Sequence, residues 1–213
     1  ILLTEEDFVA PGRAVLSDRR LQHISTVLAG APEQVLNIGL LNGHLGRGRI
    51  LGIDGNSVVL DVRFDREPPA PSQISLLLAL PRPKSLRRIL QAVTALGIKK
   101  IILVNSYRVE KSYWQSPLLD SAALREQLLL GLEQACDTIL PQIQLRRRFK
   151  PFVEDELPNL VSGTNCLTAH PGASVPCPAN VDLPTWLAIG PEGGFIPYEI
   201  GRLHAAGFRE VHC

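Results

Sequence analysis

The sequence predicts two domains of different class: a small β-barrel over residues 1–66 and a parallel α/β domain over residues 73–213. A length of 213 residues suits one large or two modest domains. Three prolines fall within Pro68–Pro71, where neither a helix nor a β-ladder can continue, so residues 67–72 are expected to form an extended linker. The hydrophobic rhythm changes at the same place, from short strands to strands that alternate with helices.

The N-terminal domain is predicted to consist mainly of short strands. One brief helix is expected over residues 18–28, and strands are expected over residues 35–38, 48–53 and 58–62. The turn residues Asn42-Gly43 and Asp54-Gly55-Asn56 separate these strands as in β-hairpins. So many short strands in one segment favour a small barrel.

The C-terminal domain begins with a near-continuous apolar run over residues 74–80, as expected for a strand buried on both faces. Pro83 then begins a helix that Gly97 ends, and Ser121 is expected to cap a second long helix. The apolar face of this second helix carries Leu124, Leu128, Leu132 and Ala135. Further strands are predicted over residues 101–104, 143–145, 166–169, 186–189 and 210–213, with helices over residues 153–160 and 198–206. This alternation predicts a parallel sheet covered by helices.

Composition limits the class of protein. Hydrophobic residues make up 45% and charged residues 20%, and the formal net charge is +1, so any nucleic-acid binding must come from a local patch. The four cysteines show no C-x-x-C pair and no histidine at metal-ligand spacing, so we expect reduced thiols and no metal site. No segment reaches membrane-spanning length, and the start does not resemble a signal peptide. We therefore expect a soluble cytoplasmic protein without a membrane partner.

Two loops follow apolar strands and are the candidates for ligand binding, because open parallel sheets bind ligands at the carboxyl ends of their strands. They are Ala169-His170-Pro171-Gly172 and Gly190-Pro191-Glu192-Gly193-Gly194. The glycines of the second loop let the backbone turn sharply and approach a ligand closely. Its exposed N–H groups can then bind a flat heterocycle or a carboxylate.

Other known motifs do not account for the chain. No phosphate-binding G-x-x-x-x-G-K-[ST] motif and no G-x-S-x-G nucleophile motif occurs. Gly43, Gly46 and Gly48 lie in a hairpin pattern rather than before a helix, so they do not form a dinucleotide fingerprint. Glu154-Asp155-Glu156 suits an acidic first helical turn better than a catalytic cluster.

Basic residues gather in three places: Arg13, Arg19, Arg20, Arg47 and Arg49; Lys84, Arg87 and Arg88; and Arg146, Arg147, Arg148 and Lys150. Each group alone suits an ordinary solvated surface. Together with Arg108 and Lys111, and with the nearby aromatic residues Tyr107, Tyr113 and Trp114, they suit a track that contacts an RNA backbone and stacks its bases. We predict RNA contacts at Arg13, Arg47, Arg49, Lys84, Arg87, Arg88, Arg108 and Lys111.

Over essentially its whole length the chain resembles the 16S ribosomal RNA (uracil-N3)-methyltransferases of the SPOUT superfamily. The most specific element is Ile189-Gly190-Pro191-Glu192-Gly193-Gly194-Phe195. Supporting elements are Lys84, Ala95-Leu96-Gly97-Ile98, Arg108-Val109, Lys111, Glu133-Gln134-Ala135, Pro141 and His170-Pro171.

The resemblance implies a PUA-like RNA-binding barrel followed by a SPOUT domain whose C-terminal part is tied in a trefoil knot. It implies S-adenosylmethionine as cofactor, a uridine N3 in 16S rRNA of the small ribosomal subunit as target, and a homodimer formed through the SPOUT domain. The cofactor-binding residues that it implies are Ala169, His170, Pro171, Ile189, Gly190, Pro191, Glu192, Gly193 and Gly194.

Some features depart from the family pattern and predict a divergent branch. Cys136-Asp137-Thr138-Ile139 and Gly172 stand where the family usually carries arginines. The family's Leu-Gly-x-Arg-Ile-Leu-Arg-x-Glu-Thr segment, which completes the knot, does not occur, and the sequence contains no methionine. We therefore expect the natural chain to extend beyond both Ile1 and Cys213.

The implied chemistry assigns roles to two residues. Uracil N3 carries a proton at neutral pH, so methylation there needs a base or a cation that stabilises the anion. Arg108 is the candidate for holding RNA or stabilising that anion, and Glu192 is the candidate base, unless it fixes its loop by accepting backbone hydrogen bonds. Three alternatives remain: a non-catalytic RNA-binding protein on the same fold, a methyltransferase acting on another RNA, and a nucleotide-dependent enzyme, which the absent fingerprint disfavours.

Overall fold

The computed structural model describes residues 1–212. Their contacts divide the chain into two compact units. Unit 1 contains residues 1–70 and 129–140, and unit 2 contains residues 71–128 and the described residues from Pro141 onward. The long helix α3 (Ser121–Ala135) therefore contributes its second half to unit 1 and its first half to unit 2. The sequence pattern shows this helix as a single apolar stripe and gives no sign of the division.

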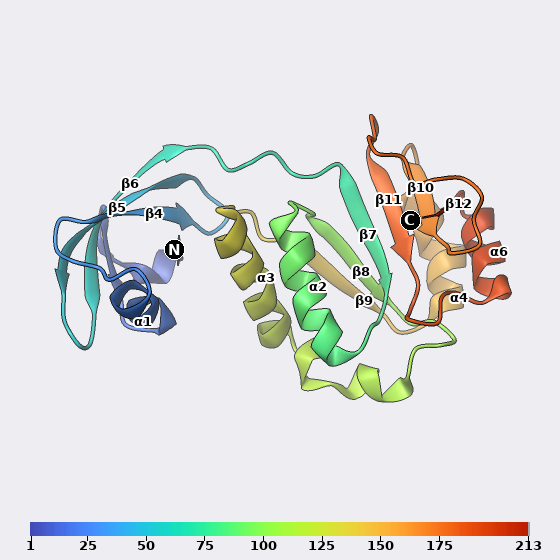
Figure 1. The fold of residues 1–213 in the computed structure, drawn as a ribbon, viewed down its shortest axis with the longest axis horizontal. Coiled ribbons are helices and arrows are strands. Elements are labelled where there is room, and N and C mark those ends of the chain that lie inside the picture. Colours follow the sequence, from blue (N-terminus) through green and yellow to red (C-terminus); the bar gives the residue numbers. More distant parts are fainter. Residues whose placement is uncertain (213) are drawn as a thin grey trace. The chain divides into compact units, whose positions relative to one another are not determined.

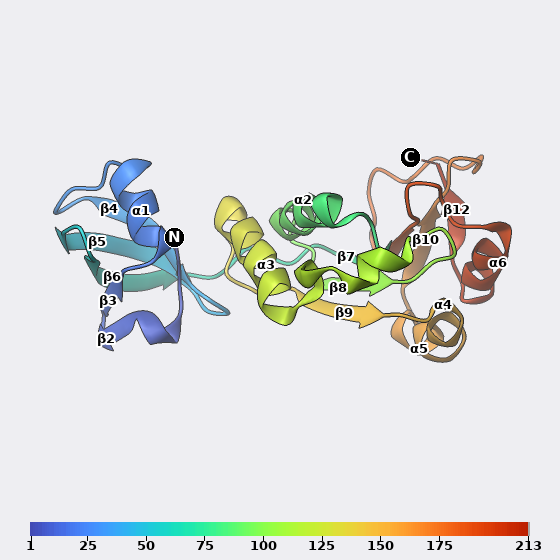
Figure 2. The same ribbon diagram turned by 90° about the horizontal axis from the view of Figure 1, so that it is seen from below.

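Unit 1 is built on a six-stranded sheet that curls into a half-barrel (Figures 1 and 2). Its strand order is β1-β4-β5-β6-β3-β2, and all pairs are antiparallel except β1 with β4. The strands are β1 (Leu2–Leu3), β2 (Phe8–Ala10), β3 (Arg13–Leu16), β4 (Val35–Leu40), β5 (Leu45–Ile53) and β6 (Val58–Arg66), with a 3-10 turn η1 (Glu5–Asp7) and a helix α1 (Arg19–Thr26). Ile24 of α1 packs with Leu16, Ile38, Ile50 and Leu60 in the core.

The predicted strands of unit 1 are found, but they are longer and more numerous than expected. β1, β2 and β3 were not predicted, because strands of two to four residues carry too little alternation to be recognised. β5 begins at Leu45 and shifts register near Gly46, where a Cβ atom would lie 2.0 Å from the Arg63 carbonyl oxygen. β6 continues to Arg66, so the segment predicted as a linker, residues 67–72, begins directly after the last residue of β6.

Unit 2 contains a second six-stranded sheet, and here every pair is parallel (Figure 1). The order is β12-β10-β11-β7-β8-β9. The strands are β7 (Ile74–Ala79), β8 (Lys100–Val104), β9 (Gln142–Arg146), β10 (Asn165–Ala169), β11 (Thr185–Ile189) and β12 (Arg209–Val211). The predicted parallel α/β fold is confirmed. Cys213, which was expected at the end of the last strand, lies outside the described residues.

The helices of unit 2 begin and end close to the predicted places. α2 (Pro83–Ala95) buries Leu86 and Leu90 alongside β7 and β8, and Gly97 ends it with a φ of +79° (Figure 1). Two 3-10 turns, η2 (Lys111–Gln115) and η3 (Pro117–Leu119), precede α3. Ser121 is the first helical residue of α3 and not its cap, because the Leu124 amide donates to the Asp120 carbonyl.

A helical run from Phe149 to Leu160 starts one turn earlier than the predicted helix over residues 153–160. It consists of α4 (Phe149–Pro151), a π-helical turn η4 (Phe152–Glu156) and α5 (Leu157–Leu160). Burial of Phe149 and Phe152 extends the apolar face upstream, and Pro151 lies in the first turn, where a missing N–H costs no hydrogen bond. The last helix, α6 (Pro197–Ala205), starts at a proline in its first turn.

The connection from β10 to β11 passes around the short edge strand β12. Just after the end of β10, the His170 amide donates a hydrogen bond to the Val211 carbonyl oxygen, on one side of β12. Pro176 forms a parallel bridge with His212 on the other side of β12. β12 thus lies between β10 and a segment of the β10–β11 connection. The trefoil knot that the resemblance implies stays a prediction. Among residues 1–212, no helix is both long and apolar enough to cross a membrane.

Candidate functional site

The carboxyl ends of β10, β11 and β12 surround a hollow of about 290 Å³ in unit 2. Ala169 is in register with Ile189 on one side and Val211 on the other, so the three strands end at the same level. The hollow is lined by Ala169, His170, Pro171, Ile189, Gly190, Pro191, Glu192, Gly194 and His212. All the residues predicted to hold a cofactor line it except Gly193. His212 was missed because nothing in the sequence shows that β12 ends beside β10.

The Gly190–Gly194 loop depends on glycine at specific positions. A Cβ atom on Gly190 would lie 2.9 Å from the Phe195 amide nitrogen, closer than such atoms approach, and in a tight contact of 3.2 Å with the Gly194 backbone. Gly194 adopts a φ of +73°, which side chains disfavour, and its amide donates to Pro191 at 2.7 Å. The loop is therefore a tight turn that a larger residue at either position would open.

Arg108 lies in the loop that follows β8 and reaches the Gly190–Gly194 loop. Its guanidinium donates a hydrogen bond to the Gly193 carbonyl oxygen. A Cβ atom on Gly193 would lie 3.0 Å from the Arg108 Cδ atom, so the arginine side chain runs directly along the loop. Gly193 therefore serves the contact with Arg108 rather than the lining of the hollow.

Among the described residues, no amide of the Gly190–Gly194 loop donates a hydrogen bond to the carboxylate of Glu192. Its carboxylate lies 3.8 Å from the guanidinium of Arg82, at the start of α2, and both side chains are more than half exposed. The alternative role predicted for Glu192, accepting backbone hydrogen bonds, is therefore not what the structure shows. An exposed ion pair of this length contributes little stability.

His170 is held at the mouth of the hollow by Glu210. Its Nδ1 atom lies 3.2 Å from Glu210 and 3.1 Å from the Gly172 amide, and the other Glu210 oxygen lies 3.0 Å from His204. The amide donates to an unprotonated Nδ1, whereas the carboxylate needs a proton there, so His170 satisfies one contact at a time. Gly172, which stands where the family pattern usually carries an arginine, thus supplies one of these two contacts through its amide.

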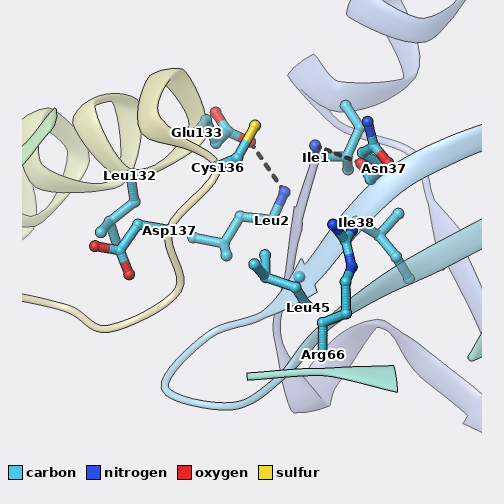
Figure 3. Close-up of a pocket in the computed structure, with 11 residues that line it drawn as sticks. Ile1, Leu2, Asn37, Ile38, Leu45, Arg66, Leu132, Glu133, Cys136 and Asp137 are labelled. Atoms are coloured by element: carbon cyan, nitrogen blue, oxygen red, sulfur yellow. Dashed lines mark hydrogen bonds between the residues drawn. The ribbon is translucent and has the colours of Figure 1, made fainter. Parts of the chain in front are cut away.

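A separate, smaller hollow of about 110 Å³ lies within unit 1 (Figure 3). Its walls are mainly apolar, with Leu2, Ile38, Leu45 and Leu132 on them, and Glu133 accepts a hydrogen bond from the Leu2 amide at 3.3 Å. The volume is below the usual range for ligand pockets, which is about 300–1,000 Å³. Glu133 therefore anchors the N-terminal strand here, and neither Glu133 nor Gln134 lines the hollow at the ends of β10, β11 and β12.

The Cys136–Ile139 segment, where the chain departs from the family pattern, also has a structural role in unit 1. The Asn42 amide donates to the Thr138 carbonyl at 2.8 Å, and the Thr138 hydroxyl donates to Gly43. These bonds attach the segment after α3 to the β4–β5 hairpin. Elsewhere, in unit 2, burial raises the pKa of the Cys166 thiol, as expected for an unreactive cysteine.

Comparison with known proteins shows the family of the chain. The RNA methyltransferase domain family matches residues 68–212. The chain is also 34% identical to the ribosomal RNA small subunit methyltransferase E of Treponema pallidum (strain Nichols), over 99% of this chain and 82% of that protein. The chain belongs to this methyltransferase E family. The predicted family is thereby confirmed, and the Gly190–Gly194 loop lies within the matched domain.

Two solved structures show the same fold. A methyltransferase E from Neisseria gonorrhoeae, bound to S-adenosyl methionine, is 19% identical with a TM-score of 0.73 and covers 100% of this chain and 88% of its own. A protein from Legionella pneumophila, in complex with the bound cofactor SAM, is 20% identical with the same TM-score and the same coverage of both chains. At these identities the likeness supports the predicted fold class, with its curled N-terminal sheet and parallel α/β unit.

The basic residues predicted to contact RNA in unit 2 are all exposed, on α2 and beyond β8. They are Lys84, Arg87, Arg88, Arg108 and Lys111. Tyr107 is 80% exposed beside Arg108, whereas Trp114 is buried and stacks under the guanidinium of Arg147 at 5.5 Å. Of the three aromatic residues near Arg108, Tyr107 is thus the most exposed, and Tyr113 is half-buried.

In unit 1 the predicted arginines share the outer face of the curled sheet. Arg13 of β3 and Arg49 of β5 both pair with Asp61 of β6, on opposite sides of that strand. Arg47 of β5 lies directly opposite Arg63 of β6. Arg49 is already paired with Glu33 and Asp61, at 3.2 and 3.4 Å. Arg63 was missed by the sequence reasoning, which lacked the β5–β6 register. Like charges directly opposite one another are unfavourable, so Arg47 and Arg63 suit an anionic ligand.

Proposed function

We propose that this protein transfers a methyl group from S-adenosylmethionine to N3 of a uridine in 16S rRNA of the small ribosomal subunit. The observation that carries the proposal is the glycine-dependent hollow at the carboxyl ends of β10 and β11, in a chain of the methyltransferase E family. The name of the Treponema relative supports methylation of small-subunit ribosomal RNA, and the ligands of the two solved structures support S-adenosylmethionine as the methyl donor.

The residues around the hollow suit S-adenosylmethionine. The volume of about 290 Å³ is close to that of small-ligand pockets, and Gly190 keeps one wall free of side-chain atoms. Ala169–Pro171 and Ile189–Gly194 are the segments that would hold the cofactor, largely through main-chain groups. When bound, the cofactor supplies an electrophilic methyl group. The protein's task is then to align the RNA nitrogen and to manage one proton.

Arg108 suits both the orientation of RNA and the stabilisation of a uridine anion. One of its N–H groups donates to Gly193, and a guanidinium has five, so donors remain for an incoming ligand. Glu192 remains the candidate base, since its carboxylate is exposed at the edge of the hollow. If Glu192 accepts the N3 proton, Glu192→Gln lowers kcat about 100-fold or more. Methylation near the wild-type rate would exclude it as the base.

The two domains expected from the sequence take different parts in this proposal. Residues 1–66 would grip RNA through the arginines of the curled sheet, residues 67–72 would link the domains, and residues from 73 onward would carry out methyl transfer. A homodimer through the second domain and a cytoplasmic location belong to the same proposal. Light scattering of the purified protein tests the dimer.

The reaction is tested on ribosomal RNA from cells with and without the intact gene. We expect digested 16S rRNA to lose one 3-methyluridine when the gene is deleted, as measured by nucleoside mass spectrometry. Purified protein with S-adenosylmethionine should restore it to small subunits from the deletion strain. An unchanged nucleoside profile would reject the proposal, and loss of another methylated nucleoside would assign a different target.

A further inference from the structure

Glu199 is a buried carboxylate with no role in the sequence analysis. It is the third residue of α6 and only 2% exposed. One of its oxygens accepts the Ile196 amide at 3.0 Å, as an acidic residue at this position of a helix often does. A capping glutamate with no other contact would lie at the surface, so this bond alone does not explain the burial.

The same carboxylate binds the loop that follows β8. It accepts the Ser106 hydroxyl at 3.1 Å and the Tyr107 amide at 2.8 Å. Both oxygens are therefore occupied, and two of the donors lie more than ninety residues before Glu199 in the sequence. Burying a charged carboxylate is costly unless donors satisfy it, and these three donors meet that requirement.

These bonds close a ring of contacts around the glycine loop. Tyr107 is followed by Arg108, whose guanidinium donates to Gly193. Gly193 lies three residues before Ile196, which donates to Glu199. The ring thus runs from Glu199 through the loop after β8 to Arg108, across to Gly193 and back along the chain to α6.

We propose that Glu199 is a positioning residue for methyl transfer: it holds Arg108 against the Gly190–Gly194 loop and so fixes both the cofactor hollow and the cation beside it. The proposal rests on the proposed function. Glu199 acts through Tyr107 and Ile196, because its own carboxylate is enclosed by these protein donors and contributes nothing to the lining of the hollow.

Glu199→Gln is the direct test, because it keeps the size of the side chain but replaces one acceptor oxygen with a donor. We expect kcat to fall about tenfold or more, with a smaller change in the KM for S-adenosylmethionine. Glu154→Gln is the matched control: it removes another carboxylate that binds α6, through Arg202 at 3.1 Å, but does not touch the ring. The control should keep kcat within about twofold of wild type.

A double-mutant cycle separates positioning from general stability. Arg108→Ala breaks the ring at its other side, so adding Glu199→Gln to it should lower kcat by less than about twofold further. If the two substitutions lower kcat independently, so that their factors multiply in the double variant, the proposal is overturned. A Glu199→Gln variant with wild-type kcat would overturn it too. If Glu199→Gln does not fold, Ser106→Ala replaces it in the cycle, because it removes only one of the donors to Glu199. Its smaller effect on kcat should likewise almost vanish when Arg108→Ala is already present.

Hydrogen exchange gives a readout that does not need activity. In Glu199→Gln, the amides of Tyr107, Gly193 and Gly194 should exchange at least tenfold faster than in wild type, while those of β8 should keep their rates. Unchanged exchange in the loop would overturn the ring. If Glu199→Gln shows the faster exchange but the wild-type protein binds no S-adenosylmethionine, the ring of contacts is supported and the proposed function is rejected.

Discussion

The two sheets of this protein place their polar groups in different ways. The central strands of the parallel sheet of unit 2 are buried along most of their length, so its candidate chemistry lies in the loops at the carboxyl ends of the strands. The mainly antiparallel sheet of unit 1 buries one face and exposes the other, and its basic residues stand on the exposed face. A change in a loop of unit 2 should therefore affect the reaction, whereas a change on the sheet of unit 1 should affect RNA affinity.

The largest effect is expected for Gly190→Ala in unit 2. The added methyl group meets main-chain atoms of Gly194 and Phe195, which cannot move without opening the turn. We expect the Kd for S-adenosylmethionine, measured by calorimetry, to rise about 10- to 100-fold. Gly201→Ala on α6 is the control, because its Cβ atom meets nothing within 4 Å, and it should leave the Kd unchanged. Equal affinities in the two variants would contradict the role of the loop.

Tyr107→Ala should weaken RNA binding without weakening cofactor binding. The ring is 80% exposed next to Arg108, and stacking of one base on an aromatic ring contributes about 1–3 kcal/mol. We expect KM for the RNA substrate to rise about tenfold, with recovery in Tyr107→Phe. Tyr198→Ala is the matched control: Tyr198 is 48% exposed but is covered by Arg202, 5.3 Å from its ring. A similar loss in both variants would remove Tyr107 from the RNA site.

Acid should destabilise unit 1 through Asp7. Burial alone would raise the pKa of this carboxyl, but hydrogen bonds from Arg20, at 2.7 Å on each oxygen, and from the Thr4 amide outweigh burial and lower the pKa. A lowered pKa adds stability above the pKa of the unfolded chain, about 4, and that stability disappears as the pH falls through the folded value. Asp7→Asn should cost about 1–3 kcal/mol in urea unfolding at pH 7 and less at pH 3. An equal cost at both pH values would contradict the ion pair.

The smallest effect is expected for single arginines on the sheet of unit 1. Arg47→Ala should weaken RNA binding about threefold and reduce the dependence of log K on log salt by about 0.7–0.9, as for one lost phosphate contact. Arg49→Ala should do less, because Arg49 is already bound to Glu33 and Asp61. Equal losses of RNA affinity in Arg47→Ala and Arg49→Ala would mean that Glu33 and Asp61 release Arg49 when RNA binds.

The features that could be predicted from the sequence are local ones. The apolar runs of β7, β8 and β11 and the glycines after Ile189 each carry their own pattern, so both the parallel sheet and the candidate site were found. Features that depend on distant partners were missed. β1 exists only because Leu2 pairs with Gly39, Arg63 faces Arg47 only through the β5–β6 register, and Glu199 is an ordinary acidic helix residue until Tyr107 lies beside it.

Hydrogen exchange of the wild-type protein with and without S-adenosylmethionine tests the central claim most directly. The cofactor should slow exchange in peptides that cover residues 169–172 and 189–195, at the ends of β10 and β11, and leave the sheet of unit 1 unchanged. Protection in unit 1 instead, or none anywhere at saturating cofactor, would show that this hollow is not the methyl-donor site.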